Sequence, residues 1–521
     1  MNTTEINAPL TTVEKRKKRK KRLLCLVSLL LIVFGLYYFI GVRSYVIEYD
    51  DEVENFKYGS IGSEGVNGLP YWVFQAMPHL FQDKLGPNGY ASFGFIYEDG
   101  QDIPTGFSKR VVQGVDRVWL NCAGCHVGTY EDPNGEIQQV VGGSANRMRL
   151  LDFIQFFREA AIDTRLTGDN LVKSVNAVGG DLNFFEELVY KYVIFGAVKK
   201  GLLALRDQLA FLDRDDLEDW GPGRVDTFGP YKAIQFGFPM DKEHLSVQAL
   251  NGSTDYPSLW MQRPREGMNL HWDGNNNSVA ERNLSAALGA GVTPITVDIK
   301  RLGRLREWMW DFPAPKYPLM DSLDQGLLEK GKPLYAEYCA ECHGDMGTGR
   351  YPDQYNYDSN HYSRLGRVEH IDDIGTDTGR LDSYTENFAA AQNMLYAGYP
   401  WRFTHFKKTN GYANHPLDGI WAASPYLHNG SVPTLRDLLE PSYRRPKVFY
   451  RGSNQFDWKK VGYESYVEHA KGDHPVAPEG DLFLFDTSKF GNGNKGHEGK
   501  EYGTYLSAEE KDAIVEYMKT F

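Results

Sequence analysis

The sequence predicts a mainly α-helical protein built from two similar domains with long ordered loops, preceded by one N-terminal transmembrane helix. Three observations predict this fold class. Apolar residues recur at helical spacing, and long strand-like runs are scarce. A Cys-x-x-Cys-His motif occurs twice, at residues 122–126 and 339–343. An apolar segment near the N-terminus carries no charge. A chain of 521 residues has room for two or three domains.

The N-terminal segment has the pattern of a membrane anchor. Residues 15–22 read KRKKRKKR, and the twenty residues Leu23–Val42 contain no charged side chain. At about 1.5 Å per residue such a helix spans the ~30 Å hydrocarbon core of a bilayer. We therefore expect a basic cytoplasmic tail at 1–22 and a single transmembrane anchor at 23–42 in a bacterial inner membrane. The remaining chain would lie in the periplasm. A cleaved signal peptide is the alternative, but no Ala-x-Ala site follows the apolar run.

The two repeated motifs predict the cofactor. They read Cys122-Ala-Gly-Cys125-His126 and Cys339-Ala-Glu-Cys342-His343. With this spacing two thiols add across the vinyl groups of one haem, and the adjacent histidine coordinates its iron. A zinc site would place its cysteine pairs closer together, and a thioredoxin-like site would need a βαβ pattern. The sequence therefore predicts two covalently bound c-type haems in two cytochrome c-like domains.

Helices are expected directly before both motifs. A glycine, a second residue and the first cysteine recur at a spacing of four, in the sets Gly114, Val118, Cys122 and Gly331, Tyr335, Cys339. This spacing brings each set onto one helix face, and it resembles the N-terminal helix of class I cytochromes c. Ser322 and Gln325 form a capping box for the second helix.

A closing helix and a connector complete the second domain. Ser507 and Glu510 form a capping box, and Ile514, Met518 and Phe521 follow on one stripe. Residues 311–318 read DFPAPKYP, a Pro-rich connector. We therefore predict an N-terminal haem domain at 50–310 and a C-terminal cytochrome c domain at 319–521.

Residues 149–213 are expected to form a helical insertion that packs around the first haem. Apolar residues recur there at helical spacing. They are Leu150, Phe153, Phe156 and Phe157, followed by Phe184, Leu188, Val189 and Tyr192.

The charge balance bears on possible partners. The chain has 57 basic and 69 acidic residues, and eight of the bases lie in residues 15–22. The predicted domains are therefore strongly acidic, which argues against nucleic acid and suits a basic electron-transfer partner. Solubility alone is an equally good reason for this acidity.

Several stretches make the chain resemble the bacterial di-haem cytochrome c peroxidase superfamily, and within it the di-haem rubber oxygenase-like cytochromes c. They are 70–72 (PYW), 121–126 (NCAGCH), 271–275 (HWDGN), 337–343 (EYCAECH), 419–431 (GIWAASPYLHNGS) and 496–497 (GH). The resemblance covers roughly residues 55–521. It implies an oxidoreductase in which one six-coordinate haem relays electrons and the other binds peroxide or dioxygen at an open iron.

The sixth ligand of the second haem is expected in the loop before the closing helix. This Gly-rich loop contains His497 and no methionine, and the resemblance also implies a second histidine ligand. His428, in the PYLHNGS stretch, is the rival ligand or a haem-pocket residue, and Tyr443 is a further candidate. His415, like other histidines in polar loops, is expected to be solvated.

The first haem lacks an obvious sixth ligand. No histidine occurs between His126 and His244, and Met148 and Met240 are more simply core residues. We therefore expect an open iron. His271 is a candidate proton donor or ligand there, with a structural role as the alternative. The resemblance implies that Trp272 lies between the haems, although a buried packing role is also open.

One departure from the peroxidases concerns proton delivery. They carry an acid-base glutamate about twenty residues beyond this tryptophan, where the chain reads AALGAGVT (286–293). This favours an oxygenase-like activity. A pure electron carrier and a protein-modifying di-haem enzyme remain alternatives. The resemblance also implies a calcium ion, for which loop carbonyls near Pro425 could serve.

Overall fold

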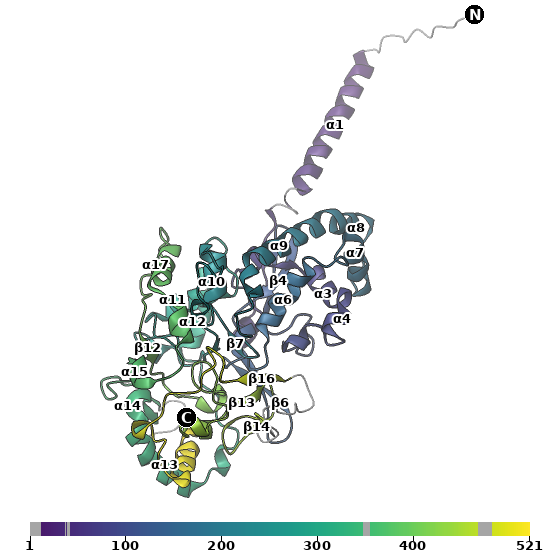
Figure 1. The fold of residues 1–521 in the computed structure, drawn as a ribbon. Helices are drawn as coiled ribbons and strands as arrows, with labels where there is room; N and C mark the ends of the chain where they lie inside the picture. The colour runs from purple at the N-terminus through teal and green to yellow at the C-terminus, as the bar shows by residue number, and fades with distance from the viewer. Residues whose placement is uncertain (1–11, 37, 39–41, 347–354, 467–481) are drawn as a thin grey trace, which may run out of the picture.

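The computed structural model describes residues 12–521 except 37, 39–41, 347–354 and 467–481 (Figure 1). Helices account for 44% of the residues and strands for 12%. The helices of the N-terminal part are α1 (Thr12–Leu36), α2 (Glu52–Tyr58), α3 (Tyr71–Leu80), α4 (Gln82–Leu85), α5 (Ala123–His126), α6 (Leu150–Ala160), α7 (Gly168–Ala177), α8 (Phe184–Val189), α9 (Phe195–Gln208), α10 (Phe228–Phe236), α11 (Val279–Gly289) and α12 (Ile299–Trp310). Those of the C-terminal part are α13 (Gln325–Tyr338), α14 (Ala340–His343), α15 (Ile371–Ile374), α16 (Gly379–Ser383), α17 (Glu386–Leu395), α18 (Leu435–Leu438) and α19 (Ala508–Met518).

The strands form small antiparallel sheets. The first sheet has the order β1-β3-β4-β2. The strands are β1 (Tyr45–Val46), β2 (Leu69–Pro70), β3 (Phe107–Val112), β4 (Val115–Leu120), β5 (Val127–Glu131), β6 (Ile137–Val141), β7 (Arg224–Val225), β8 (Thr254–Asp255), β9 (Asp345–Met346), β10 (Tyr355–Asn356), β11 (Val368–His370), β12 (Gly411–Ala413), β13 (Val448–Arg451), β14 (Phe456–Asp457), β15 (Gly462–Tyr463) and β16 (Phe483–Asp486). The remaining sheets have two strands each.

The predicted N-terminal transmembrane helix is wrong. Among the described residues, no helix has the length and apolar character needed to cross a membrane. Helix α1 begins at Thr12, includes the basic block and ends at Leu36. Its apolar part is therefore confined to Leu23–Leu36. At about 1.5 Å per residue this part is roughly 21 Å long, shorter than the ~30 Å core of a bilayer. The predicted fold class is therefore wrong in its transmembrane helix. The predicted single-pass inner-membrane localisation with periplasmic domains is not supported either.

The segment before the first motif is a β-hairpin and not the expected helix. Strands β3 and β4 pair in register from Phe107 opposite Leu120 to Val112 opposite Val115. The turn between them contains Gln113 and Gly114, both at positive φ. Along β4, Val118 and Leu120 are buried and alternate with more exposed neighbours. The alternation of a strand was not recognised in the sequence, because residues four apart share one side of a strand as well as one face of a helix.

The first part of the helical insertion is buried, and the second part is exposed. Phe153, Phe156 and Phe157 of α6 are buried in an aromatic core with Phe74 and Tyr90. In contrast, Phe184, Leu188, Val189 and Tyr192 are exposed, so the prediction that they pack around the first haem is wrong. The segment is apolar on both faces, and periodicity alone could not decide which face turns inward.

The elements predicted for the second motif are present. Helix α13 ends at Tyr338, directly before Cys339, and α19 begins after Ser507, whose capping box with Glu510 is formed. The two helices cross closely at Gly331, where an added Cβ would lie 1.9 Å from the carbonyl oxygen of Ala513. Tyr335 packs beside this crossing against Phe521, with ring centroids 4.8 Å apart. The N-cap of α13 is Asp324, however, and not the predicted Ser322.

The described residues pack into three large cores and one small one. One core belongs to the insertion and the first sheet, and another combines α13 and α19 with residues 421–463. A third joins Phe56, Ala123 and α10–α12 to residues 384–406. Residues 384–406 therefore pack against the N-terminal part although they follow the predicted connector. The domain boundary at 311–318 stays a prediction.

The crossing of α13 and α19 yields a testable prediction. Replacing Gly331 with alanine should lower the free energy of unfolding by about 1–3 kcal/mol, because the new methyl group overlaps a backbone carbonyl that cannot rotate away. Gly326→Ala is the matched control in the same helix. It meets only a side-chain oxygen at 3.3 Å and should stabilise by about 0.5–1 kcal/mol. Denaturant unfolding measures both, and equal effects would contradict the close crossing.

Candidate haem-binding centres

The first motif is held in a tight turn after β4. Asn121 fixes this turn: its Nδ2 donates to the carbonyl oxygens of Lys57 and Gly59, both at 3.1 Å, and its Oδ1 accepts from the backbone N–H of Ala123 at 3.0 Å. Helix α5 then consists of four residues and ends at His126. Desolvation lowers the pKa of His126 to about 4. The ring is therefore neutral at pH 7, which is the form that binds iron.

Tyr256 lies beside His126. The two ring centroids are 6.1 Å apart with an edge-on geometry, and the tyrosine hydroxyl donates to the carbonyl oxygen of Arg224 at 3.1 Å. In the part of the chain that the structure describes, no second histidine ring contacts His126. The core around Cys122 and Ala123 is built from apolar and aromatic side chains, including Phe228 and Phe388.

The second motif follows α13 without a break. Cys339 is the C-cap of α13 and the N-cap of α14, and α14 carries Cys342 and His343. The Nδ1 atom of His343 lies 2.7 Å from the carbonyl oxygen of His415, which accepts its proton. This hydrogen bond fixes the tautomer and leaves Nε2 as the free coordinating atom.

His497 faces His343. The two ring centroids are 6.2 Å apart with an interplanar angle of 45°. An imidazole nitrogen lies about 2 Å from a bound metal, so that each ring centre is about 3 Å from it and two rings on opposite sides are about 6 Å apart. Desolvation lowers the pKa of His497 to about 3, and its Nδ1 is buried without a hydrogen-bond partner among the described residues. The observed spacing therefore fits an iron held between the two rings.

The loop that carries His497 is held by Arg445. This buried guanidinium donates to the carbonyl oxygens of Asn494, Gly496 and His497 at 2.6, 2.9 and 3.2 Å. The backbone N–H of His497 also donates to the carbonyl oxygen of Ile374 at 2.7 Å. Gly496 allows this approach, because an added Cβ would lie 2.3 Å from the backbone of Gly375. The loop is thus rigidly positioned although it contains no regular structure.

The cysteines fit covalent haem attachment. None of Cys122, Cys125, Cys339 and Cys342 is paired in a disulfide. Each pair lies beside a histidine whose neutral form is favoured by burial. These residues therefore meet the chemical requirement for attaching a haem at each motif.

A continuous series of contacts connects the two motif histidines. His343 donates to the carbonyl of His415, whose ring lies edge-on to Trp272 with centroids 5.9 Å apart. The Nε1 atom of Trp272 donates to the carbonyl oxygen of Asp255 at 2.9 Å, and the next residue is Tyr256, beside His126. Trp272 therefore lies between the two motifs.

His271 contacts the same series. Its Nδ1 atom lies 2.6 Å from Oδ1 of Asn275, which accepts its proton, and its carbonyl oxygen accepts from Nε2 of His415 at 3.0 Å. The ring stacks on Phe406 at 6.3 Å, and the φ of His271 is +60°. Desolvation lowers its pKa to about 4. His271 is therefore a neutral imidazole whose Nε2 can accept a proton.

The alternative ligands make other contacts. His428 stacks on Tyr412 at 4.0 Å, and Tyr443 is exposed. Met148 is a buried core residue whose sulfur accepts from the hydroxyl of Tyr256 at 3.9 Å, and Met240 packs at the edge of a small cluster. None of these contacts involves the ring of His126 or His343.

Sequence reasoning missed two residues of the site. The prediction that His415 is solvated is wrong, because desolvation lowers its pKa to about 4, and both its ring and its carbonyl are used. Arg445 was not singled out. Glu281 was not singled out either; its carboxylate accepts from Asn276, Thr404 and His405, outside the contacts described above. The carbonyl groups that His343 and Arg445 contact gave no usable signal, because carbonyl acceptors leave no trace in a sequence.

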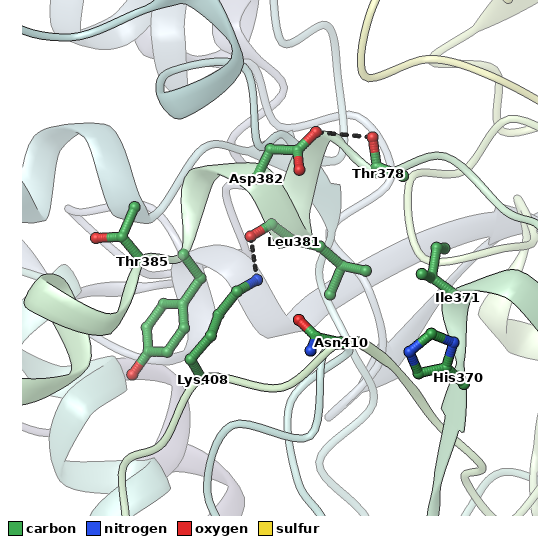
Figure 2. A pocket seen from close by; sticks show the side chains of 9 residues that line it. His370, Ile371, Thr378, Leu381, Asp382, Thr385, Lys408 and Asn410 are labelled. Atoms are coloured by element: carbon green, nitrogen blue, oxygen red, sulfur yellow. Dashed lines mark hydrogen bonds between the residues drawn. The ribbon is translucent and has the colours of Figure 1, made fainter.

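A separate open cleft of about 580 Å³ lies beside α16 (Figure 2). Thr378 donates to Asp382 at 2.8 Å, and Lys408 donates to the carbonyl oxygen of Leu381 at 2.5 Å. His370 lies at the right in Figure 2, on the opposite side of the view from Thr385. None of the predicted site residues lines this cleft.

Calcium remains a prediction. Within the described ranges, no group of three or more His, Cys, Asp or Glu side chains is arranged to hold a metal ion. The proposed ligands near Pro425 are backbone carbonyls, which such a group does not include.

Comparison with known proteins supports a cytochrome. Residues 411–450 match the family described as RoxA-like, cytochrome c-like. This match supports a relation to rubber-oxygenase-like cytochromes c and a covalently bound c-type haem with iron. The matched segment contains neither Cys-x-x-Cys-His motif, but it contains His415 and Arg445, which hold His343 and the His497 loop. The wider di-haem peroxidase superfamily stays a prediction.

Two proteins of Sinorhizobium fredii are similar to the chain. The first, uncharacterized protein y4iJ, is 26% identical over 554 residues, covering 87% of this chain and 88% of that protein. The second, uncharacterized protein y4iM, is 29% identical over 320 residues, covering 54% of this chain and 67% of that protein.

The role of Arg445 is testable by substitution. Arg445→Leu should lower the free energy of unfolding by about 2–4 kcal/mol, because several buried carbonyl groups lose their donor at once. Its neighbour Arg444 is the control: this side chain is mostly exposed, and Arg444→Leu should change stability by less than about 0.5 kcal/mol. Denaturant titration of both variants measures the difference, and similar small effects would show that Arg445 does not hold the loop.

Proposed function

We propose that this chain is a di-haem c-type cytochrome oxidoreductase with two unequal centres. The haem attached through Cys339 and Cys342 would be held by His343 and His497 and would relay electrons. The haem attached through Cys122 and Cys125 would be held by His126 alone and would bind dioxygen or peroxide. This proposal rests on the 6.2 Å spacing between the rings of His343 and His497. His126 has no described histidine ring at a comparable distance.

The haems would supply stored electrons and an iron site for a small oxidant, and the chain would determine which iron is accessible. His415 would contribute by accepting the Nδ1 proton of His343, which leaves Nε2 to hold the iron. Arg445 contributes by holding the loop that presents His497. Apolar side chains around Cys122 would exclude water and offer no competing ligand.

Trp272 would carry electrons between the centres. Electron transfer is faster through contacting groups than across gaps, and Trp272 contacts both the His415 ring and the Asp255 carbonyl. His271 would handle protons in the same region, because Asn275 fixes its tautomer with an open Nε2. Glu281 is unsuited to proton transfer. Burial alone would raise the pKa of this carboxyl, but its hydrogen bonds outweigh that effect and keep the pKa below its usual value.

The partners follow from the surface charge and from the chemistry. The acidic composition suits a basic electron-transfer protein and disfavours nucleic acid. Peroxide or dioxygen would be the small oxidant. A pure electron carrier is the competing function, and it would need a strong sixth ligand at both irons.

Ligand binding to the reduced full-length protein tests the proposal. Carbon monoxide should shift the spectrum of one haem and leave the other unchanged. In His497→Ala both haems should respond, and added imidazole should restore the original behaviour of the second. His428→Ala is the control, because that ring stacks on Tyr412 and should leave the number of responsive haems at one. If neither haem of the unmodified protein responds, the oxidoreductase proposal fails and the electron-carrier function stands.

Substitution of Trp272 tests the connection between the centres. Trp272→Phe removes the donor to the Asp255 carbonyl and should cost about 1–3 kcal/mol of stability. It should also slow electron exchange between the haems in stopped-flow measurements. Trp310→Phe, outside the series of contacts, should leave the rate unchanged. An unaltered exchange rate in a folded Trp272→Phe variant would exclude Trp272 as the route.

A further inference from the structure

The helix formed by α8, η4 and α9 exposes an apolar stripe. The three elements are continuous: α8 spans Phe184–Val189, the π-helical turn η4 spans Tyr190–Ile194, and α9 spans Phe195–Gln208. Six large apolar side chains in its first half are solvent-exposed by 39–75%. They are Phe184, Phe185, Leu188, Val189, Tyr192 and Val193. Figure 1 shows this helix at the outer edge of the molecule.

The opposite face of the same helix is already packed. Val198 and Leu202 are buried, and Tyr190, Ile194 and Phe195 pack against the core of the insertion. The helix is close to α7, because a Cβ added at Gly168 would lie 2.5 Å from the carbonyl oxygen of Lys191. The outward stripe therefore cannot turn inward without unpacking this face. A contiguous exposed apolar stripe of this kind marks an interaction surface.

The exposed apolar area of the stripe is comparable to one side of a protein–protein interface. A fully exposed aromatic side chain offers about 150–250 Å², so the six partly exposed side chains together present roughly 600–700 Å². This is larger than most apolar patches on monomeric proteins. It is close to the ~800 Å² that each partner contributes to a stable protein–protein interface.

The order of the exposed side chains along the helix indicates what the partner is. The six apolar residues of the stripe form three pairs, 184 with 193, 185 with 192 and 188 with 189, placed symmetrically about the midpoint between residues 188 and 189. An antiparallel copy of the same helix reverses their order and brings each apolar side chain opposite another. A twofold axis produces this arrangement, because the same surface then meets itself.

We infer that the α8–η4 stripe is a homodimer interface, in which two copies pack antiparallel about a twofold axis between Leu188 and Val189. In this register Phe184 lies opposite Val193 of the second copy, and Phe185 lies opposite Tyr192. Glu186 lies opposite Lys191, which also pairs with Asp169 of its own chain at 2.5 Å. The inference does not depend on the haem centres and goes beyond the proposed function.

Sedimentation velocity of the haem-loaded full chain over a range of concentrations tests this inference. The unmodified protein should show a monomer–dimer equilibrium. Phe185→Glu and Tyr192→Glu should each weaken it at least roughly tenfold, because each places a charge in the apolar contact. Ile295→Glu is the matched control: Ile295 is 88% exposed and lies outside the stripe, so its substitution should have no effect. All three side chains are exposed, so folding should be preserved.

Cysteine cross-linking tests the register. With Cys25→Ser removing the exposed thiol of α1, Leu188→Cys should form a disulfide-linked dimer on mild oxidation, because the two copies of residue 188 meet near the axis. Lys200→Cys, further along the helix, should not. A monomer at all concentrations would overturn the inference, and so would a dimer that survives both glutamate substitutions. Equal cross-linking at 188 and 200 would overturn the antiparallel register.

Discussion

The hydrogen bond from His343 Nδ1 to the carbonyl oxygen of His415 is the contact on which the site depends. It fixes the proton on one nitrogen of the imidazole and leaves the other for coordination, and the ring of His497 lies 6.2 Å from that of His343. Backbone carbonyl groups take part on both sides of the two rings. The His415 carbonyl orients His343, and Arg445 donates to three carbonyls of the loop that carries His497. The geometry therefore does not rely on regular secondary structure, and long loops can carry it.

The same His415 connects the second centre to the first. Its ring contacts Trp272 and donates to the carbonyl of His271, while Trp272 donates to Asp255, next to Tyr256 and His126. Burial keeps the imidazoles of His271 and His415 neutral by lowering their pKa values to about 4. The region between the motifs is consequently a packed series of hydrogen-bonded groups, which is the arrangement that the proposed electron exchange would use.

Much of the second centre was predictable, because its signals are local. Gly331 and Tyr335 repeat at helical spacing before Cys339, and the capping box at Ser507 marks the closing helix. Other features were not. The hairpin before Cys122 satisfies a helical spacing by coincidence, and the apolar residues of α8 could not reveal which face turns outward. His415 and Arg445 act on carbonyl groups, which carry no sequence signal. The apolar part of α1 is shorter than the sequence pattern indicated, because the helix that includes the basic block ends at Leu36.

The inequality of the two irons is the central claim, and low-temperature electron paramagnetic resonance of the oxidised full-length protein tests it most directly. The account predicts two different ferric signals: a low-spin signal from an iron held by two imidazoles, and a high-spin signal from an iron with one strong axial ligand. Two low-spin signals of equal intensity, each typical of two strong side-chain ligands, would contradict the account.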